Sequence, residues 1–316
     1  MSARACRAVA VGGGTGLPKV LRCLLDIGLE TTAVVTMADD GGSSGHLRRE
    51  LGMLPPGDAR NCLLAMAADE TSPLASVFSY RFPLGEGLAG HALGNLIIAA
   101  LADIEGSFPE ALATAGDLLH VRGRVLPSTL DDVVLTAEDV AGVRVVGQAN
   151  VAESMAPIAT VRFAGETPAR AFGPAVDAIL QAGLVVVGPG SLFTSLLPNF
   201  LVGGIADALR ETGARVVYVC NVANQRGETT GMDAADHVDA LVRHGLRGVF
   251  DVVVLHDSER YPISGDVEPV QAGKDAVARI REHGVDVVFG DVADPADPRH
   301  HSAAGLTRVL TEVLAR

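Results

Sequence analysis

The sequence predicts an α/β fold built on a doubly wound, mostly parallel β-sheet. Short, continuous runs of β-branched and other apolar residues recur along the chain, and most are followed by Gly or Asp and then by a helical pattern. Continuous apolar runs, as opposed to alternating ones, are typical of strands buried on both faces, as in a parallel sheet. In such folds, ligands bind where the carboxyl ends of the strands meet the following loops.

Taken in order, the apolar runs predict six strands and the helical patterns predict seven helices. The strands are expected at residues 7–11, 31–37, 184–187, 215–220, 250–255 and 285–289. The helices are expected at residues 17–26, 58–68, 91–104, 109–119, 233–244, 272–283 and 302–314. Ser107-Phe-Pro-Glu110 has the pattern of a capping box, which indicates a helix start at this point.

Residues 121–165 depart from this pattern. They contain short β-like runs at 132–135, 143–146 and 158–163, separated by turn residues. We expect a small antiparallel β insert, or an extension of the sheet, within one domain that spans residues 1–316. No internal repeat or Pro/Ser-rich linker divides the chain.

Composition narrows the class of protein. With 48% hydrophobic residues the chain can bury a large core, whereas a net charge of −13 and 4% aromatic residues argue against a nucleic-acid partner. Four scattered cysteines without a CxxC pair indicate reduced thiols and a cytoplasmic protein, and strand-like sequence starts too early for a signal peptide. Residues 178–206 carry no charge, but their Gly and Pro residues would break a lipid-facing helix, so we expect no membrane insertion.

The first candidate site is the glycine-rich turn GGGTG at 12–16, directly after the first strand. A strand, a glycine turn and a helix start form the geometry in which free backbone amides hold a phosphate, here at Gly13, Gly14, Thr15 and Gly16. Leu17 stands where a dinucleotide fingerprint needs its third glycine, and Lys19 lies outside the P-loop arrangement. A generic tight turn is the alternative.

The second candidate is ADDGGSSG at 38–45, which follows the second strand and should lie beside the first. Asp39 or Asp40 could accept hydrogen bonds from ribose hydroxyls or hold Mg²⁺ beside a phosphate. The alternative is a solvated turn in which Ser43 or Ser44 caps a helix.

Further polar residues follow other predicted strands or start helices. In PPGDARNC at 55–62, Asp58 is a plausible N-cap, and Arg60 and Asn61 would lie in the first turn. Asn95 is the one amide of a strongly apolar helix, and it is either a satisfied core amide or a ligand contact. Histidines are poor catalytic candidates: His237 and His244 are two turns apart, and His300-His301 is expected to be an exposed turn.

The later strands end in two more such segments. GPGS at 188–191 predicts a second anion-binding turn, with Ser191 at a helix start. The stretch at 220–232 is rich in amides, which bind bases and sugar hydroxyls without adding charge, and the alternative is a long surface loop. Two glycine turns on one sheet favour a two-ended ligand such as a sugar nucleotide.

Six ordered motifs together resemble the gluconeogenesis factor (YvcK-like) family, which is related to the CofD-like 2-phospho-L-lactate transferases. The motifs are GGGTGL at 12–17, ADDGGSSG at 38–45, PPGDARNC at 55–62, GHALGNLIIAAL at 90–101, GPGSLFTSLLPN at 188–199 and GETTGMDAADHV at 227–238. Family members often read NLMTQPGET where this chain has Arg226 in place of the proline at 221–229. Arg226 adds a positive charge and removes the proline that would stiffen the loop, so the ligand bound near this loop could differ from that of other family members.

The resemblance implies a Rossmann-like fold that binds a UDP-sugar, UDP-N-acetylglucosamine or UDP-glucose, with Mg²⁺ as a further candidate. It assigns phosphate contacts to the first turn and a second anionic or sugar contact to Gly188, Gly190 and Ser191. Asp39 and Asp40 match acids that hold metal or substrate in the transferase branch. Asn61, Asn95, Asn199 and Asn221 match polar positions of the family around the same cleft. Ser43, Ser44, Asn224 and Gln225, from the second and fifth segments, are further candidates for contacts with the ligand.

Three functional hypotheses follow. The favoured one is a UDP-sugar-binding regulator needed for cell shape and envelope synthesis during gluconeogenic growth. Such a regulator could also assemble as a homo-oligomer. The alternative is a Mg²⁺-dependent nucleotidyl or phospho-group transferase in which Asp39 and Asp40 hold the metal. An NAD-dependent dehydrogenase is the weakest, since the dinucleotide fingerprint fails at Leu17.

Overall fold

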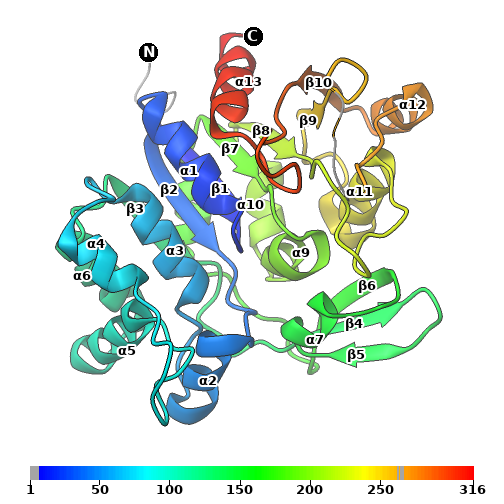
Figure 1. The fold of residues 1–316 in the computed structure, drawn as a ribbon. Helices are drawn as coiled ribbons and strands as arrows, with labels where there is room; N and C mark the ends of the chain where they lie inside the picture. Colours follow the sequence, from blue (N-terminus) through cyan, green and yellow to red (C-terminus); the bar gives the residue numbers. More distant parts are fainter. Residues whose placement is uncertain (1–6, 262, 264–266) are drawn as a thin grey trace.

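The protein is built on a seven-stranded, fully parallel sheet with helices on both faces, as a computed structural model shows (Figure 1). The structure describes residues 7–261, 263 and 267–316. The strand order is β10-β9-β8-β7-β1-β2-β3. In chain order the strands are β1 (Arg7–Gly12), β2 (Glu30–Val35), β3 (Gly123–Pro127), β7 (Leu184–Val187), β8 (Arg215–Val219), β9 (Val252–His256) and β10 (Asp286–Gly290). The predicted α/β doubly wound fold is confirmed.

Both faces of the sheet are buried, which explains the continuous apolar runs. Along β1, Ala8 and Ala10 pack into the core on one face, and Val9 and Val11 pack into the core on the other. The first core is covered by α1 (Leu17–Asp26), α3 (Gly57–Met66), α4 (Pro73–Ser79), α5 (Leu93–Glu105), α6 (Phe108–Leu118) and α13 (Ala303–Ala315). The second is covered by α8 (Gly173–Gln181), η1 (Leu192–Leu196), α9 (Leu197–Phe200), α10 (Ile205–Glu211), α11 (Ala234–Leu241), η2 (Val242–Leu246) and α12 (Lys274–Glu282).

The topology creates a switch point between β1 and β7. From β1 the chain continues to β2 and β3 on one side, and it returns at β7 to build the other side. The loops after β1 and β7 therefore leave adjacent strand ends in opposite directions. A crevice at such a point is where open α/β sheets bind their ligands.

The antiparallel insert is smaller than predicted. It is a three-stranded sheet with the order β5-β4-β6, made of β4 (Leu135–Asp139), β5 (Arg144–Val146) and β6 (Ile158–Phe163) together with α7 (Gln148–Ala152). Residues 123–127, expected within the insert, instead form β3 and pair in parallel with β2. Val125 and Leu126 are buried there, so this run extends the main core. Figure 1 shows the insert below the main sheet, on the side opposite α13.

Two further expectations concern the cysteines and the membrane. Cys23, Cys62 and Cys220 are buried free thiols, as expected, and Cys6 lies outside the described residues. Across residues 7–261, 263 and 267–316, no helix has both the length and the apolar character needed to cross a membrane.

Candidate functional site

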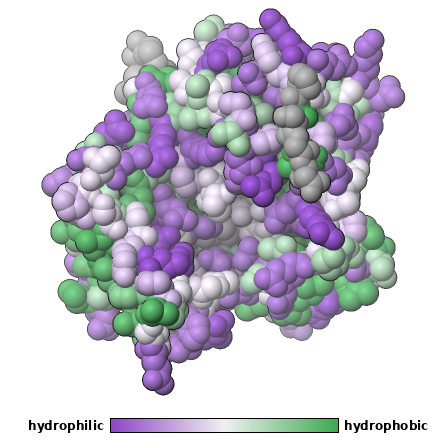
Figure 2. Space-filling view, in the orientation of Figure 1, coloured by the Kyte–Doolittle hydropathy of each residue, from purple (hydrophilic) through white to green (hydrophobic). Residues whose placement is uncertain are grey.

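A cavity of about 790 Å³ lies at the carboxyl ends of β1, β7 and β8. Figure 2 shows the molecule hollowed near its centre in the orientation of Figure 1, with mostly hydrophilic residues around the hollow. The cavity is lined by Thr15, Gly16, Lys19, Pro189, Gly190, Ser191, Asn221, Ala223, Asn224, Gln225, Arg226, Thr230, Val267, Glu268, Arg299, His300 and His301. Predicted residues from three separate motifs thus meet at the switch point.

The two glycine turns are packed against each other. A Cβ at Gly16 would lie 2.3 Å from the carbonyl oxygen of Pro189, so only glycine allows this approach of the β1 and β7 loops. The loop after β8 is tied to the same place, because Asn221 Nδ2 donates to Gly190 O at 3.0 Å. Ser191 Oγ donates to Gln225 Oε1 at 2.6 Å. Three loops therefore form one wall of the cavity.

Three cations line the cavity, and two of them are ion-paired: Lys19 with Asp294, and Arg299 with Asp297 at 2.8 Å. Lys19, Arg226 and Arg299 line it, with Glu268 as the one acidic residue in the lining. Lys19 Nζ donates to His301 O at 2.9 Å and lies 3.6 Å from Asp294 Oδ2. Arg226 is exposed, which leaves its charge available to an anionic ligand.

The segment before α13 closes the cavity, and sequence reasoning missed it. His300-His301 was expected to be an exposed turn, which is wrong for His301: this residue is buried, and its Nε2 lies 3.0 Å from Cys220 O. Burial lowers the pKa of His301 to about 4, so the ring is neutral at pH 7. No local sequence signal reports this contact, because the partner strand is about 80 residues away in the chain.

The helix start after the β7 loop is already capped by an internal carboxylate. Glu228, in the β8 loop, accepts hydrogen bonds from the amides of Phe193 and Thr194 at 2.7 and 3.2 Å and from the Thr194 hydroxyl. Its burial raises the pKa of the Glu228 carboxyl to about 7. The backbone amides of Phe193 and Thr194 at the start of η1 therefore already donate to Glu228 and are not free to bind a ligand anion. The part of the predicted anion-binding turn that faces the cavity is Gly190 and Ser191.

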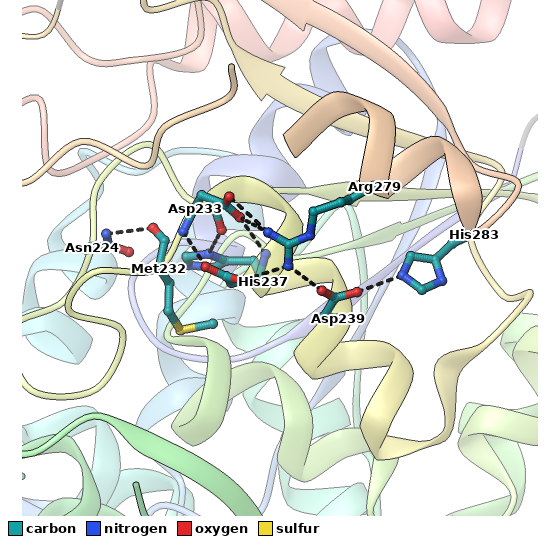
Figure 3. Close-up of polar contacts among 8 residues, drawn as sticks. Asn224, Met232, Asp233, His237, Asp239, Arg279 and His283 are labelled. Atoms are coloured by element: carbon teal, nitrogen blue, oxygen red, sulfur yellow. Dashed lines mark hydrogen bonds and ion pairs between the residues drawn. The ribbon is translucent and has the colours of Figure 1, made fainter. Parts of the chain in front are cut away.

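The β8 loop is anchored where it meets α11 (Figure 3). Asn224 Nδ2 donates to Met232 O at 2.9 Å, which closes the loop on itself. Asp233 caps α11 with a full capping box, and Arg279 of α12 pairs with Asp233, Asp236 and Asp239 at 3.1, 2.8 and 2.5 Å. These ion pairs fix α11 against α12 and give the loop a rigid base.

A second polar cluster lies on the other side of the β1 turn. Asp58 is not the N-cap of α3, which is Pro56. Instead its Oδ2 accepts a hydrogen bond from the Gly14 amide at 2.8 Å. Burial, followed by the nearby charge of Asp39, raises the pKa of Asp58 to about 6. At Gly13, a Cβ would lie 2.7 Å from Asp58 Oδ2, so glycine is needed here as well.

The predicted metal pair, Asp39 and Asp40, faces different partners. The two carboxylate oxygens of Asp40 accept hydrogen bonds from the amides of Gln148 and Ala149 at 2.9 and 2.8 Å, which ties it to α7. Asp39 accepts one hydrogen bond from Gly41 N at 3.0 Å. Within the described part of the chain, no three His, Cys, Asp or Glu side chains are grouped to hold a metal ion. Mg²⁺ is often held by one or two carboxylates plus substrate phosphates, for which Asp39 and Asp58 are the better-placed acids.

The remaining predicted residues divide between this cluster and the core. Ser43 Oγ lies 3.1 Å from His91 Nδ1 and accepts a hydrogen bond from Asn95 Nδ2 at 3.0 Å. Ser44 Oγ accepts from Gly57 N at 3.1 Å, and Asn61 Oδ1 accepts from Arg60 at 2.7 Å. Asn199 is fully buried, and its amide donates to Gly12 O at 3.2 Å, so it supports the β1 turn from behind. Gly188 has a positive φ of 77° and provides the bend that follows β7.

A parallel sheet with a polar cavity at its switch point defines a Rossmann-like α/β protein. The family model for 2-phospho-L-lactate transferase CofD matches residues 8–293. The chain belongs to this CofD-like family, and more particularly to its gluconeogenesis factors.

Two comparisons support the narrower assignment. The chain is 39% identical to the gluconeogenesis factor of Halalkalibacterium halodurans, over 96% of this chain and 95% of the relative. It is 43% identical to putative gluconeogenesis factors of Thermotoga maritima and of Nostoc sp., over 97% of this chain and 99% and 68% of the relatives. The crystal structure of a UPF0052 family protein from Bacillus halodurans superposes with a TM-score of 0.88 at 36% identity, covering 98% of this chain and 99% of the other.

Proposed function

We propose that this gluconeogenesis factor binds a UDP-sugar, UDP-N-acetylglucosamine or UDP-glucose, in the cavity at the switch point. In this proposal the bound state regulates envelope synthesis and thereby cell shape during growth on gluconeogenic carbon sources. The observation that carries the proposal is the lining of this one cavity, where three cations and three amides converge on the ends of β1, β7 and β8. The ligand and the role follow from the resemblance to the family, and the cavity supplies matching chemistry.

The charges support a diphosphate ligand. A protein with a net charge of −13 repels anions unless cations meet them locally. Three cations line the cavity: Lys19 and Arg299 are paired with Asp294 and Asp297, and Arg226 has no ion pair among the described residues, so its charge is free for a ligand phosphate. The backbone turn at Thr15–Gly16 opens the first helix, whose amino end adds a favourable partial charge. The volume of about 790 Å³ lies within the usual range of small-molecule sites, which is about 300–1,000 Å³.

The amides support recognition of a base or a sugar. Asn221, Asn224 and Gln225 line the same cavity, and amides offer both donors and acceptors without net charge. Asn224 Oδ1 is buried and has no hydrogen-bond partner among the described residues, so it is a free acceptor for a ligand N–H or O–H. This arrangement suits the nucleoside or sugar end of the ligand, next to the cationic end.

A second candidate function is a Mg²⁺-dependent nucleotidyl or phospho-group transferase. The observation that favours it is the pair Asp39 and Asp58 beside the Gly13–Gly14 turn, where burial and, after it, the charge of Asp39 raise the pKa of Asp58 to about 6. Mg²⁺ would neutralise this repulsion and a substrate phosphate together.

Calorimetric titration with UDP-N-acetylglucosamine and UDP-glucose, with and without Mg²⁺, separates the two functions when the ligand is then chromatographed. We expect saturable binding that does not need the metal and ligand that is recovered intact. Metal-dependent binding, or consumption of the ligand, would favour the transferase. A complete lack of affinity for both UDP-sugars would remove the regulator proposal.

A further inference from the structure

The side of α5 that points away from the core is apolar. The buried residues of α5 are Gly94, Asn95 and Ile98, and at about 3.6 residues per turn they lie on one side of the helix. The opposite side carries Leu93, Leu96, Ile97, Ala100, Asp103 and Ile104. A surface helix normally places polar residues on its outward side, and a helix that is apolar all round is normally buried. The pattern therefore indicates that the outward side of α5 packs against another apolar surface.

This apolar surface continues into the segment before α5. Ile104 is 76% exposed, and Tyr80, Leu84 and Leu88 are 48%, 81% and 41% exposed. The segment is joined to the start of the helix, because Leu93 N donates to Tyr80 O at 2.8 Å. Figure 2 shows hydrophobic residues gathered on the lower left of the view, where Figure 1 places α5 and α6. Exposed apolar side chains that gather on one surface mark an interaction site.

Opposite charges lie at the two ends of the α5 surface. Asp103 is exposed near the carboxyl end of α5 and makes no ion pair with the residues that the structure describes. Arg81 is exposed near the amino end, since it forms a β-bridge with Ala92 and its Nη1 donates to Gly90 O. The helix dipole has the same direction, because the amino end of a helix carries positive partial charge. The surface is therefore apolar in the middle, positive at one end and negative at the other.

Such a surface is complementary to a second copy of itself in the reverse direction. In an antiparallel pair of α5 helices, Leu93 of one copy meets Ile104 of the other, and Ala100 lies near the centre of the contact. The small side chain of Ala100 allows the two helices to approach closely. Asp103 of each copy then lies toward Arg81 and the helix amino end of the other copy. A two-fold pair satisfies both ends at once, as in other isologous interfaces.

We propose that the protein forms a two-fold dimer in which the outward sides of two antiparallel α5 helices pack together. A stable interface buries roughly 800 Å² on each partner. Because α5 is only about 20 Å long, the exposed side chains at residues 80–88 widen the contact. The cavity lining contains none of these residues, so the cavity of each copy stays open to ligand. The inference therefore does not depend on the UDP-sugar proposal.

Sedimentation velocity of the full chain, from low to high micromolar concentration, tests the dimer. We expect a reversible monomer–dimer equilibrium for the wild type. Ile104→Lys places a cation in the apolar contact, and the dissociation constant should rise by about tenfold or more, since each dimer carries the change twice. Met155→Lys is the matched control: Met155 is also 76% exposed but lies between α7 and β6 of the insert, so this variant should dimerise as the wild type does.

Charge reversal tests the antiparallel order of the contact. Asp103→Arg brings two cations together, and the dissociation constant should rise by about threefold or more. The double variant Arg81→Asp/Asp103→Arg restores opposite charges at both ends and should recover most of the affinity. Thermal melting by circular dichroism checks that the variants fold, which the exposure of Asp103 favours.

Several outcomes would overturn the proposal. They are a wild type that stays monomeric at every concentration, an Ile104→Lys variant that dimerises as the wild type does, or an equal loss in Met155→Lys. A monomeric wild type would assign the apolar surface to a different protein. A double variant that recovers no affinity would contradict the antiparallel order. Because the surface lies outside the cavity, a negative result here leaves the UDP-sugar proposal in place, and loss of UDP-sugar binding leaves the dimer in place.

Discussion

Glu228 is the residue that most directly connects the chemistry of the site to the stability of the fold. Its carboxylate is fully buried and caps η1 through Phe193 and Thr194, while its own backbone oxygen accepts a hydrogen bond from Ile158 N of the insert at 3.3 Å. The neighbouring Gly227 has a φ of +81°, and a Cβ there would lie 1.6 Å from Ser154 O. One Gly-Glu pair therefore joins the β8 loop, the β7 loop and the insert.

The raised pKa of Glu228 makes a prediction for stability against pH. The folded protein holds this proton up to about pH 7, whereas an ordinary glutamate releases it near 4.5. The contribution of Glu228 to stability is therefore fully present below about pH 4.5 and is lost as the pH rises through 7. Glu228→Gln should remove roughly 3 kcal/mol of this decline, at about 1.4 kcal/mol per pKa unit. Urea unfolding from pH 5 to pH 8 measures the slope, and parallel curves for the two proteins would contradict the assignment.

The site residues that the sequence predicts differ in one respect from the site residues that it does not predict. Thr15, Gly16, Gly190 and Ser191 follow strands directly, so the strand pattern alone places them at one edge of the sheet. Glu228 and His301 act through contacts with distant segments, which leave no local pattern. Asp58 was expected as an N-cap because its sequence position fits one, but the N-cap is Pro56, two residues earlier, and the Asp58 side chain accepts a hydrogen bond from Gly14 instead.

At the scale of elements, the insert is tied to the main sheet at three separate points. Asp40, in the loop that follows β2, accepts hydrogen bonds from the two backbone amides at the start of α7. The backbone oxygen of Glu228 accepts from Ile158, and His244 Nε2 accepts from Val161 N at 3.1 Å. Burial lowers the pKa of His244, which keeps the ring neutral and able to accept this bond. The insert therefore spans from the second polar cluster to the β8 loop of the cavity.

Removing the Asp40 carboxylate should lower the local stability of the insert at α7. Asp40→Ala deprives two α7 amides of their acceptor, and a loss of about 1 kcal/mol is expected, as for other helix caps. Hydrogen exchange at residues 148–152 should accelerate, while exchange in β8 should stay the same. Asp40→Asn, which keeps one acceptor, should show a smaller effect. If Asp40 instead held a catalytic metal, Asp40→Asn would abolish Mg²⁺-dependent turnover with little change in exchange.

Most elements of the main sheet were predictable because strands buried on both faces leave continuous apolar runs. The run at 184–187 was predicted with the bounds of β7 itself. Residues 123–127 fell within the segment expected to form the insert, and no strand was predicted there; this run contains Arg124 and ends in a proline. As an edge strand, β3 tolerates both, because one of its sides is unpaired. The short helices α4 and α7 have too few turns to show a 3.6-residue period.

For the whole molecule, the contrast between overall charge and cavity charge decides which ligands can bind. The net charge of −13 argues against polyanionic partners that need a broad basic face. The cationic residues of the cavity come from α1, the β8 loop and the segment before α13. No single motif contains this cavity, so it exists only once the whole sheet has formed. The central claim is therefore that the folded chain holds a nucleotide sugar where these three segments meet.

Calorimetric titration of Arg226→Gln with UDP-N-acetylglucosamine and UDP-glucose tests this claim most directly. Arg226 is exposed in the cavity, and its side chain makes no hydrogen bond or ion pair with the residues that the structure describes, so its substitution should change affinity and leave the melting temperature unchanged. We predict roughly tenfold weaker binding than for the wild type, from the loss of one charge-assisted contact. Arg247, at the end of η2, is also exposed and is not part of the cavity lining, so Arg247→Gln should bind as the wild type does. Equal affinity of Arg226→Gln and the wild type would place the ligand elsewhere and contradict the account.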